Sequence, residues 1–389
     1  MIQKNITFIY MDGAEKAQYE PIAQEAEKRG YTVKLTDNKF EKCEIGFYCQ
    51  HINFPQYSKF SVIMLHDITQ QYGNWPDIWF LEPWNKYDIG FLPSDQWAEN
   101  WRASSSNTYA RPRLGTYVVG WPKADAVSKL VSADYKKDFY QKHRLDPNKK
   151  TILYAPAWEN DGKQDDFVQA MLPLHVNILI KQAPWNPALY PQQIENIEKM
   201  NRLHKNIPGV TILPPATNIF LAIAAADVLV SEESSTMCEA TMMGVPAVSV
   251  SDWLIPDVTP SRYPSCNYDF VITTKKKDLS SCVSRIISDY STYCQQTQEF
   301  ARTNFKNIGT CSSLIMDIVD DAIAHRKIRY PALEPRPTQK IPFKKEIKRR
   351  IIQTKRAFHD NYAVQNRLIG VLWKGASKVK HLVQKSPSE

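Results

Sequence analysis

Several features that would place the chain in a membrane, secreted or zinc-binding class are missing. No apolar run of the 389 residues approaches the roughly 20 residues that a membrane-spanning helix needs. The seven cysteines form no C-x-x-C pair and no regular spacing, so free thiols in a reducing compartment are expected. No His/Cys cluster has structural-zinc spacing. The first residues lack the pattern of a cleavable signal and predict a strand. A cytoplasmic globular protein is therefore expected.

Positive charge is concentrated near one end of the chain. The net charge is +8, but residues 340–385 hold 13 Lys/Arg against two acids, a local balance of +11 that leaves about −3 elsewhere. A basic tail predicts an anionic partner, either lipid headgroups or nucleic acid. The body of the chain is not itself basic.

Apolar runs alternate with helical patterns along most of the chain. This rhythm predicts parallel sheets with crossover helices. The predicted strands are ITFIYM (5–10), 31–35, SVIML (61–65), YDIGFL (87–92), TYVVG (116–120), TILYAP (151–156), NILIKQ (177–182), VTIL (210–213), DVLVS (227–231) and AVSV (247–250). Two Rossmann-like α/β domains, 1–125 and 126–330, are expected, followed by a proline-rich linker and basic tail at 331–389. GT-B enzymes and dinucleotide-binding proteins share this plan, but no G-x-G-x-x-G follows the first strand, which argues against a dinucleotide site.

The segment 227–250 carries the strongest site signal. A buried strand ends at Ser231, and a helix is predicted to start near Ser235 or Thr236. In parallel α/β sheets, ligands bind outside the carboxyl ends of strands, and a helix N-terminus there suits phosphate. Ser234, Ser235 and Thr236 are predicted to hold nucleotide phosphate, and Glu239 to accept from ribose hydroxyls. The alternative is that Thr236-x-x-Glu239 is only a capping box.

Four segments resemble one enzyme family, in chain order. His66-Asp67 sits where the family has H-G-T after a strand, and GWPKAD (120–125) is similar to its G-Y-P-R-N-D. KKTILYAPAWEND (149–161) resembles K-x-I-L-Y-A-P-T-W-R-D, and VSEESS (230–235) resembles T-D-Y-S-S. The family is the CDP-glycerol glycerophosphotransferases of teichoic-acid and capsule synthesis, which are of GT-B type.

The resemblance implies a function and a donor site. It implies transfer of a glycerol-phosphate or related polyol-phosphate unit from a CDP-linked donor to a surface glycan or lipid-linked acceptor, with release of CMP. The first domain would hold the acceptor and the second the nucleotide. Matching the Y-A-P-x-W segment, Tyr154, Pro156 and Trp158 are expected to line the donor site.

The strand-end position of His66 makes it the candidate general base for the acceptor hydroxyl, since an imidazole titrates near neutral pH. Asp67, which replaces the family's glycine, would orient it. The alternative is a structural histidine.

The family's second histidine, in an H-P pair, is replaced by Ala183 before Pro184, so Lys181 or Gln182 is expected to contact the donor phosphates instead.

Other functions remain open at this stage. A GT-B glycosyltransferase that uses a UDP- or CMP-linked sugar fits the same Ser-Ser and Glu239 pattern, and a non-catalytic, lectin-like protein is a third possibility. The sequence contains no D-x-D motif of the kind that holds Mg²⁺ or Mn²⁺ on a diphosphate. No metal and no cofactor are therefore expected.

The tail, residues 343–383, shows helical spacing of apolar residues with a basic opposite face. It is predicted to lie on the inner, anionic surface of the cell membrane, which would make the protein a peripheral membrane protein. Packing against the body is the alternative. Nucleic acid is not expected, because the apolar residues form a stripe instead of alternating with the basic ones. The apolar face comprises Phe343, Ile347, Ile351, Phe358, Leu368, Leu372 and Trp373.

Overall fold

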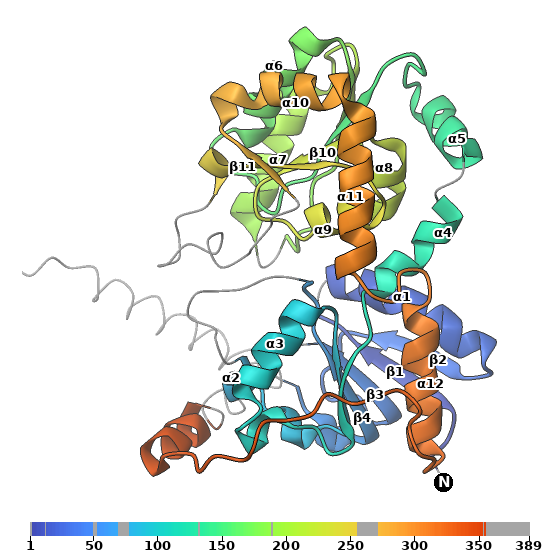
Figure 1. Ribbon diagram of the computed structural model, residues 1–389, viewed down its shortest axis with the longest axis vertical. Helices are drawn as coiled ribbons and strands as arrows, with labels where there is room; N and C mark the ends of the chain where they lie inside the picture. The colour runs from blue at the N-terminus through green and yellow to red at the C-terminus, as the bar shows by residue number, and fades with distance from the viewer. Residues whose placement is uncertain are drawn as a thin grey trace, which may run out of the picture.

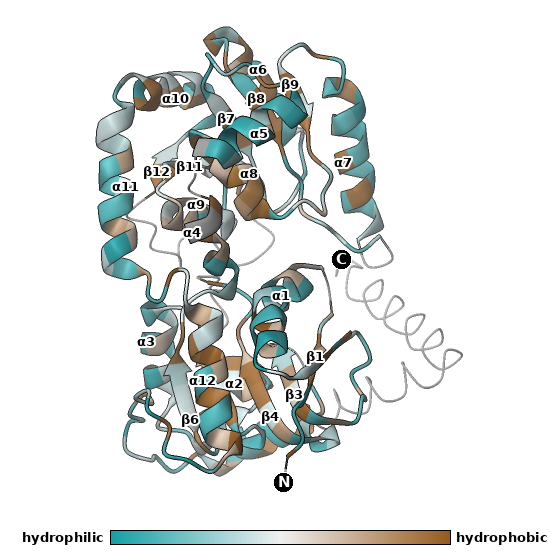
Figure 2. Cartoon of the chain, turned by 90° about the vertical axis from the view of Figure 1, so that its right-hand side faces the viewer, coloured by the Kyte–Doolittle hydropathy of each residue, from teal (hydrophilic) through white to brown (hydrophobic). Residues whose placement is uncertain are grey.

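The computed structural model describes residues 2–11, 13–49, 53–68, 78–130, 133–187, 190–254, 271–352 and 354. They form two α/β lobes stacked along the long axis of the molecule (Figure 1). Apolar strands lie inside each lobe, whereas α11 (Tyr290–Asn304) is mostly hydrophilic and α7 (Pro191–His204) is of mixed hydropathy (Figure 2). No helix among these residues is long and apolar enough to cross a membrane.

The first lobe is built on a six-stranded parallel sheet of order β2-β1-β3-β4-β5-β6. A parallel sheet is covered on both faces, which explains why its strands are nearly continuous apolar runs. One face packs against α1 (Gly13–Lys28), and the other packs under α2 (Ile78–Leu81) and α3 (Asp95–Ser104) with a tryptophan-rich core. The strands are β1 (Asn5–Ile9), β2 (Thr32–Thr36), β3 (Cys43–Cys49), β4 (Ser58–Met64), β5 (Ile89–Leu92) and β6 (Gly115–Val118).

The second lobe repeats the plan with the order β12-β11-β10-β7-β8-β9, again all parallel. Its strands are β7 (Thr151–Tyr154), β8 (Asn177–Ile180), β9 (Val210–Ile212), β10 (Val228–Ser231), β11 (Ala247–Val250) and β12 (Ile272–Thr274). Its sheet is covered by α5 (Ala133–His143), α8 (Ile219–Ala225) and α9 (Thr236–Met242) on one face, and by α6 (Lys163–Met171) and α10 (Leu279–Ser288) on the other. The predicted fold of two Rossmann-like domains is confirmed.

The chain passes between the lobes more than once. After α11, helix α12 (Cys311–Ile323) returns to the first lobe, where it packs with α1 against β1 (Figure 1). Asp125 accepts hydrogen bonds from the backbone N–H groups of Cys311 and Ser312, both at 2.7 Å, and so caps this helix. The first lobe therefore includes a helix from the stretch 126–330 that the sequence assigned to the second domain.

Residues 331–342 are not a free linker but lie along the first lobe. The backbone N–H of Leu333 donates to Thr116 O at 2.8 Å, and that of Gln339 donates to Ser106 O at 2.9 Å. Residues 343–352 are then helical, with Arg349 over the ring of Tyr109. The predicted amphipathic tail lies otherwise outside the described residues, from 355 onward.

Candidate active site at the domain junction

His66 follows β4, at the carboxyl edge of the first sheet, between two carboxylates. Its Nε2 is 3.1 Å from Asp67 Oδ2, and its Nδ1 is 3.8 Å from Oε1 of Glu15, a fully buried residue in the first turn of α1. The His66 side chain stays 25% exposed. Carboxylates beside an imidazole stabilise the cation that forms when the ring accepts a proton. Since Nδ1 is buried, a general base here would take the proton at Nε2, the nitrogen beside Asp67.

Helix α1 also places His66 next to the second lobe. The Gln18 side-chain amide donates to Leu65 O at 2.7 Å, which holds the end of β4 against α1. A Cβ added to Gly13, the first residue of α1, would be 3.7 Å from Pro184 Cγ, in the loop after β8. The carboxyl edges of the two sheets therefore face each other at this junction.

A buried charge cluster lies on the second-lobe side of the junction. Glu239, fully buried in α9, accepts a hydrogen bond from the Trp121 indole at 2.9 Å and pairs with Lys123 at 2.5 Å, both through Oε1. Its Oε2 has no hydrogen-bond partner within the described part of the chain. Lys123 was not predicted, although it stands in the GWPKAD segment where the family has arginine.

Lys181 completes this cluster. Its Nζ donates to the backbone oxygens of Gln182 (3.3 Å) and Pro215 (3.2 Å). Burial and, secondarily, the positive charge of Lys123 lower the pKa of Lys181 to about 8, while Glu239 opposes the shift. Lys123 pairs with Glu239, whereas the Nζ of Lys181 is held by backbone oxygens, so two ammonium groups lie near one carboxylate in a position that suits a phosphate group.

The start of α9 does not form the capping box. Ser235 is the N-cap residue, but its side chain makes no cap hydrogen bond. Thr236 Oγ1 donates to Ala155 O at 3.1 Å, and Ser234 Oγ accepts from the Thr236 N–H at 3.2 Å. Since Glu239 pairs with Lys123, capping does not explain its presence. The Glu239 side chain is fully buried in this structure. Its contact with ribose stays a prediction.

Glu232 anchors the loop after β7, a role the sequence did not reveal. Its carboxylate accepts from the N–H groups of Ala157 (3.0 Å) and Trp158 (3.1 Å) and pairs with Lys163 at 3.2 Å. Glu232 and Lys163 are both buried, with 0% and 1% exposure. This pair fixes the backbone that carries Trp158.

Three of the predicted donor residues lie beneath this loop. Tyr154 is fully buried and donates to Glu159 Oε2 at 2.9 Å. The Gln182 amide donates to Glu159 (2.8 Å) and to Gln164 (2.7 Å). Pro156 is also buried. These residues support the strand ends. The side chains of Tyr154 and Gln182 form hydrogen bonds within a buried polar network.

Trp158 belongs to an aromatic cluster formed by the loops after β7 and β8. Its ring centroid is 4.2 Å from that of Trp185, which in turn is 4.8 Å from that of Tyr190. Tyr190 is 40% exposed. The Trp185 Nε1 is buried without a hydrogen-bond partner among the described residues. The cluster thus places three aromatic side chains beside the junction, of which Tyr190 is the most exposed.

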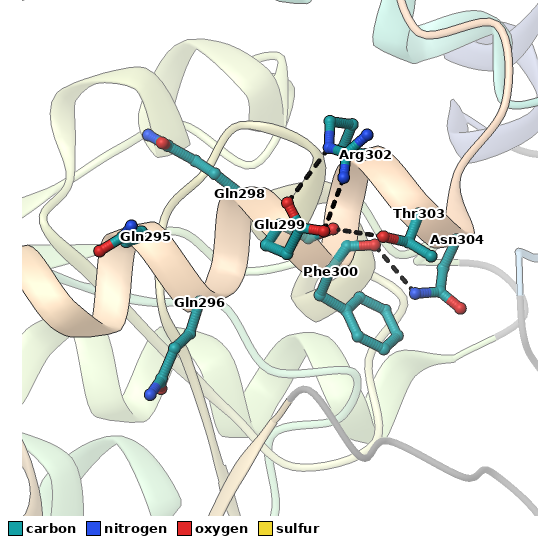
Figure 3. Close-up of a pocket in the computed structure, with 8 residues that line it drawn as sticks. All are labelled: Gln295, Gln296, Gln298, Glu299, Phe300, Arg302, Thr303 and Asn304. Carbon is teal, nitrogen blue, oxygen red and sulfur yellow. Dashed lines mark hydrogen bonds and ion pairs between the residues drawn. The ribbon is translucent and has the colours of Figure 1, made fainter.

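A cavity of about 890 Å³ lies along α11, away from the junction. Its lining side chains all come from this one helix, and Glu299 and Arg302 pair with each other (Figure 3). None of the predicted site residues lines it. Across the described residues, no group of three or more His, Cys, Asp or Glu side chains has the geometry to hold a metal ion.

The comparisons with known proteins concern the fold. No protein-family model matches the sequence, and no curated protein matches it. Among solved structures, the wall teichoic acid polymerase TagF superposes with a TM-score of 0.61 at 14% identity, over 83% of this chain and 89% of that one. A putative UDP-N-acetylglucosamine 2-epimerase from Listeria monocytogenes gives 0.59 at 13% identity, over 86% and 100%.

A UDP-GlcNAc 2-epimerase from Neisseria meningitidis bound to UDP-GlcNAc gives 0.56 at 14% identity, over 82% of this chain and 100% of that one. At such identities the similarity extends to the arrangement of the two α/β domains. The chain therefore has the GT-B-type fold of these enzymes.

Proposed function

We propose that this protein transfers a glycerol-phosphate, or related polyol-phosphate, unit from a CDP-linked donor to a hydroxyl of a cell-surface glycan or lipid-linked acceptor. His66 takes the proton of the acceptor hydroxyl, whose oxygen attacks the β-phosphorus of the donor, and CMP leaves. Asp67 and Glu15 stabilise the imidazolium. No metal is needed, because Lys123 and Lys181 offset the diphosphate charge.

The observation that carries this proposal is the pair of lysines, Lys123 and Lys181, on the second-lobe side of the domain junction. Lys123 pairs with Glu239, and Lys181, whose pKa burial lowers to about 8, donates to backbone oxygens. A diphosphate brought into this site supplies the missing negative charge. The position of His66 at the opposite carboxyl edge supports transfer to an acceptor held by the first lobe.

A second candidate is a glycosyltransferase that uses a UDP- or CMP-linked sugar. The aromatic cluster of Trp158, Trp185 and Tyr190 favours it, since rings stack on the apolar face of a sugar whereas glycerol offers no such face. The replacement of the family's second histidine by Ala183 also favours a different transferred group.

A donor panel distinguishes these functions. The full chain is incubated with CDP-glycerol, CDP-ribitol, UDP-GlcNAc and CMP-linked sugar, with a glycan acceptor, in EDTA and in Mg²⁺. CMP release from a CDP-polyol supports the proposal. UDP release, or conversion of UDP-GlcNAc to its C2 epimer, contradicts it. Activity that EDTA abolishes and Mg²⁺ restores contradicts the metal-independent mechanism.

Nucleotide affinity is expected to fall in Ser235→Ala and in Glu239→Ala. Ser235→Ala removes a hydrogen bond predicted to a phosphate oxygen, and Glu239→Ala removes those predicted from the ribose hydroxyls, at about 1–3 kcal/mol each. Calorimetric titration with CMP measures the loss, with Ser281→Ala as a control because Ser281 lies on α10, away from the junction. Unchanged affinity in both variants, with intact folding, moves the nucleotide site elsewhere.

Donor affinity is also expected to decline as pH rises through about 8, the pKa of Lys181. Only the protonated amine attracts phosphate, and above this pH binding must take up a proton. Titrations between pH 6.5 and 9.5 measure this dependence, and Lys181→Met should remove it while lowering affinity at pH 7. A pH dependence that persists in Lys181→Met assigns it to another group.

The tail completes the proposal as a membrane tether. In its described part, Phe343, Ile347 and Ile351 are 79%, 41% and 49% exposed, four residues apart on one helix. Apolar side chains beside basic ones favour an anionic bilayer surface. A chain ending at Pro342 keeps the segment packed on the first lobe and is expected not to float with anionic liposomes, whereas the full chain floats. Equal flotation of both contradicts the tether.

A further inference from the structure

A second cavity lies at the opposite end of the second sheet from the junction. It has a volume of about 570 Å³ and opens where β7 and β10 begin, between α5 and the turn before β7. Its size is typical of small-molecule sites, which span about 300–1,000 Å³. Four lysines line it, namely Lys136, Lys137, Lys149 and Lys150.

Asp227 organises two of these lysines. It is 4% exposed, and its Oδ2 accepts from the Thr151 N–H at 2.8 Å. Its Oδ1 lies 3.1 Å from Lys136 Nζ and 3.5 Å from Lys150 Nζ. Lys150 Nζ is also held 3.8 Å from the ring centroid of Tyr290. A buried carboxylate and an aromatic face thus hold two ammonium groups at one wall of the cavity.

The charge of the cavity is not balanced by its own lining. Asp227 is the one acid among the described lining residues, against four lysines. Next to the lining, Asp146 Oδ2 lies 3.9 Å from Lys149 Nζ, and Lys137 belongs to no ion pair within the described residues. Compact lysine ammonium groups bind phosphate well, and Leu145 and Pro147 add apolar lining for a carbon skeleton.

We propose that this cavity binds a small phosphorylated molecule, with its phosphate oxygens between the four lysines. The site is separate from the donor site: Lys150 and Asp227 directly precede β7 and β10, whereas the junction residues follow the other ends of these strands. The inference does not depend on the proposed transfer reaction.

Inorganic pyrophosphate is the probe for a test on the full chain. Lysine acetylation is followed residue by residue by mass spectrometry, with and without pyrophosphate. Lys137 and Lys149 should be protected, while Lys275 and Lys277, exposed on the same lobe, should not. Equal labelling of the two pairs overturns the proposal.

Variants give an independent measurement. Lys137→Ala/Lys149→Ala leaves the contacts of Asp227 intact and should weaken pyrophosphate binding at this site about 10-fold or more, whereas Lys275→Ala/Lys277→Ala should not. Unchanged binding in the first variant contradicts the site. In a parallel arm, protection by phosphatidic acid vesicles but not by pyrophosphate assigns the lysines to a lipid headgroup and overturns a soluble ligand.

Discussion

His66→Ala is expected to lower turnover at least about 100-fold, the low end for loss of a positioned base, while CMP affinity changes little. The ring lies between Asp67 and Glu15 at the edge of the first sheet, whereas the proposed donor contacts belong to the junction cluster. Single-turnover rates and CMP calorimetry separate these quantities. A folded variant that keeps more than a tenth of the activity excludes His66 as the base.

Two control variants distinguish the loss of a catalytic base from a general loss of folding. His143→Ala removes a histidine on α5 of the second lobe and should leave turnover unchanged. Glu15→Gln removes a charge but keeps the shape of the side chain, so it should reduce turnover less than His66→Ala and with little change in thermal stability. If Glu15→Gln unfolds the protein, Asp67→Asn provides the same test from the other side of the ring.

Much of the fold follows from the sequence because apolar strands alternate with helical segments. β4, β5 and β7 fall where apolar runs predict them. β3 was missed because Gly46 interrupts its apolar run. The structure needs this glycine, since a Cβ there would lie 2.7 Å from the Tyr48 ring. The return of α12 to the first lobe was also missed, because helical periodicity does not say which sheet a helix covers.

The candidate site also contains residues that the sequence indicates and residues that it does not. His66 and Glu239 could be proposed from the sequence because each belongs to a recognisable segment that follows a predicted strand. Glu15 was not, since it lies far along the chain from His66 and its neighbours are ordinary helix residues. Lys163 is 69 residues from Glu232, and no local pattern predicts a buried pair over that distance. Strand ends can be inferred from sequence, but the side chains that support them come from distant segments.

Lys163→Met is expected to destabilise the protein by about 3–5 kcal/mol, because it leaves Glu232 as an unpaired buried charge. With exposures of 1% and 0%, neither side chain is in contact with bulk water in the native structure. The N–H groups of Ala157 and Trp158 donate to the same carboxylate, which holds their loop in place. Since Trp158 is a predicted donor-site residue, CMP affinity should fall as well. Urea unfolding and CMP titration are the measurements.

The double variant Lys163→Met/Glu232→Gln makes this prediction testable even if the single variant does not fold. It removes both charges, and the glutamine oxygen can still accept from the N–H groups of the loop. Replacing both members of a buried pair costs much less than removing one. The double variant should therefore be more stable than Lys163→Met alone. If it is equally or less stable, the loss in Lys163→Met comes from packing around the lysine stem, and the ion pair is not what holds the loop.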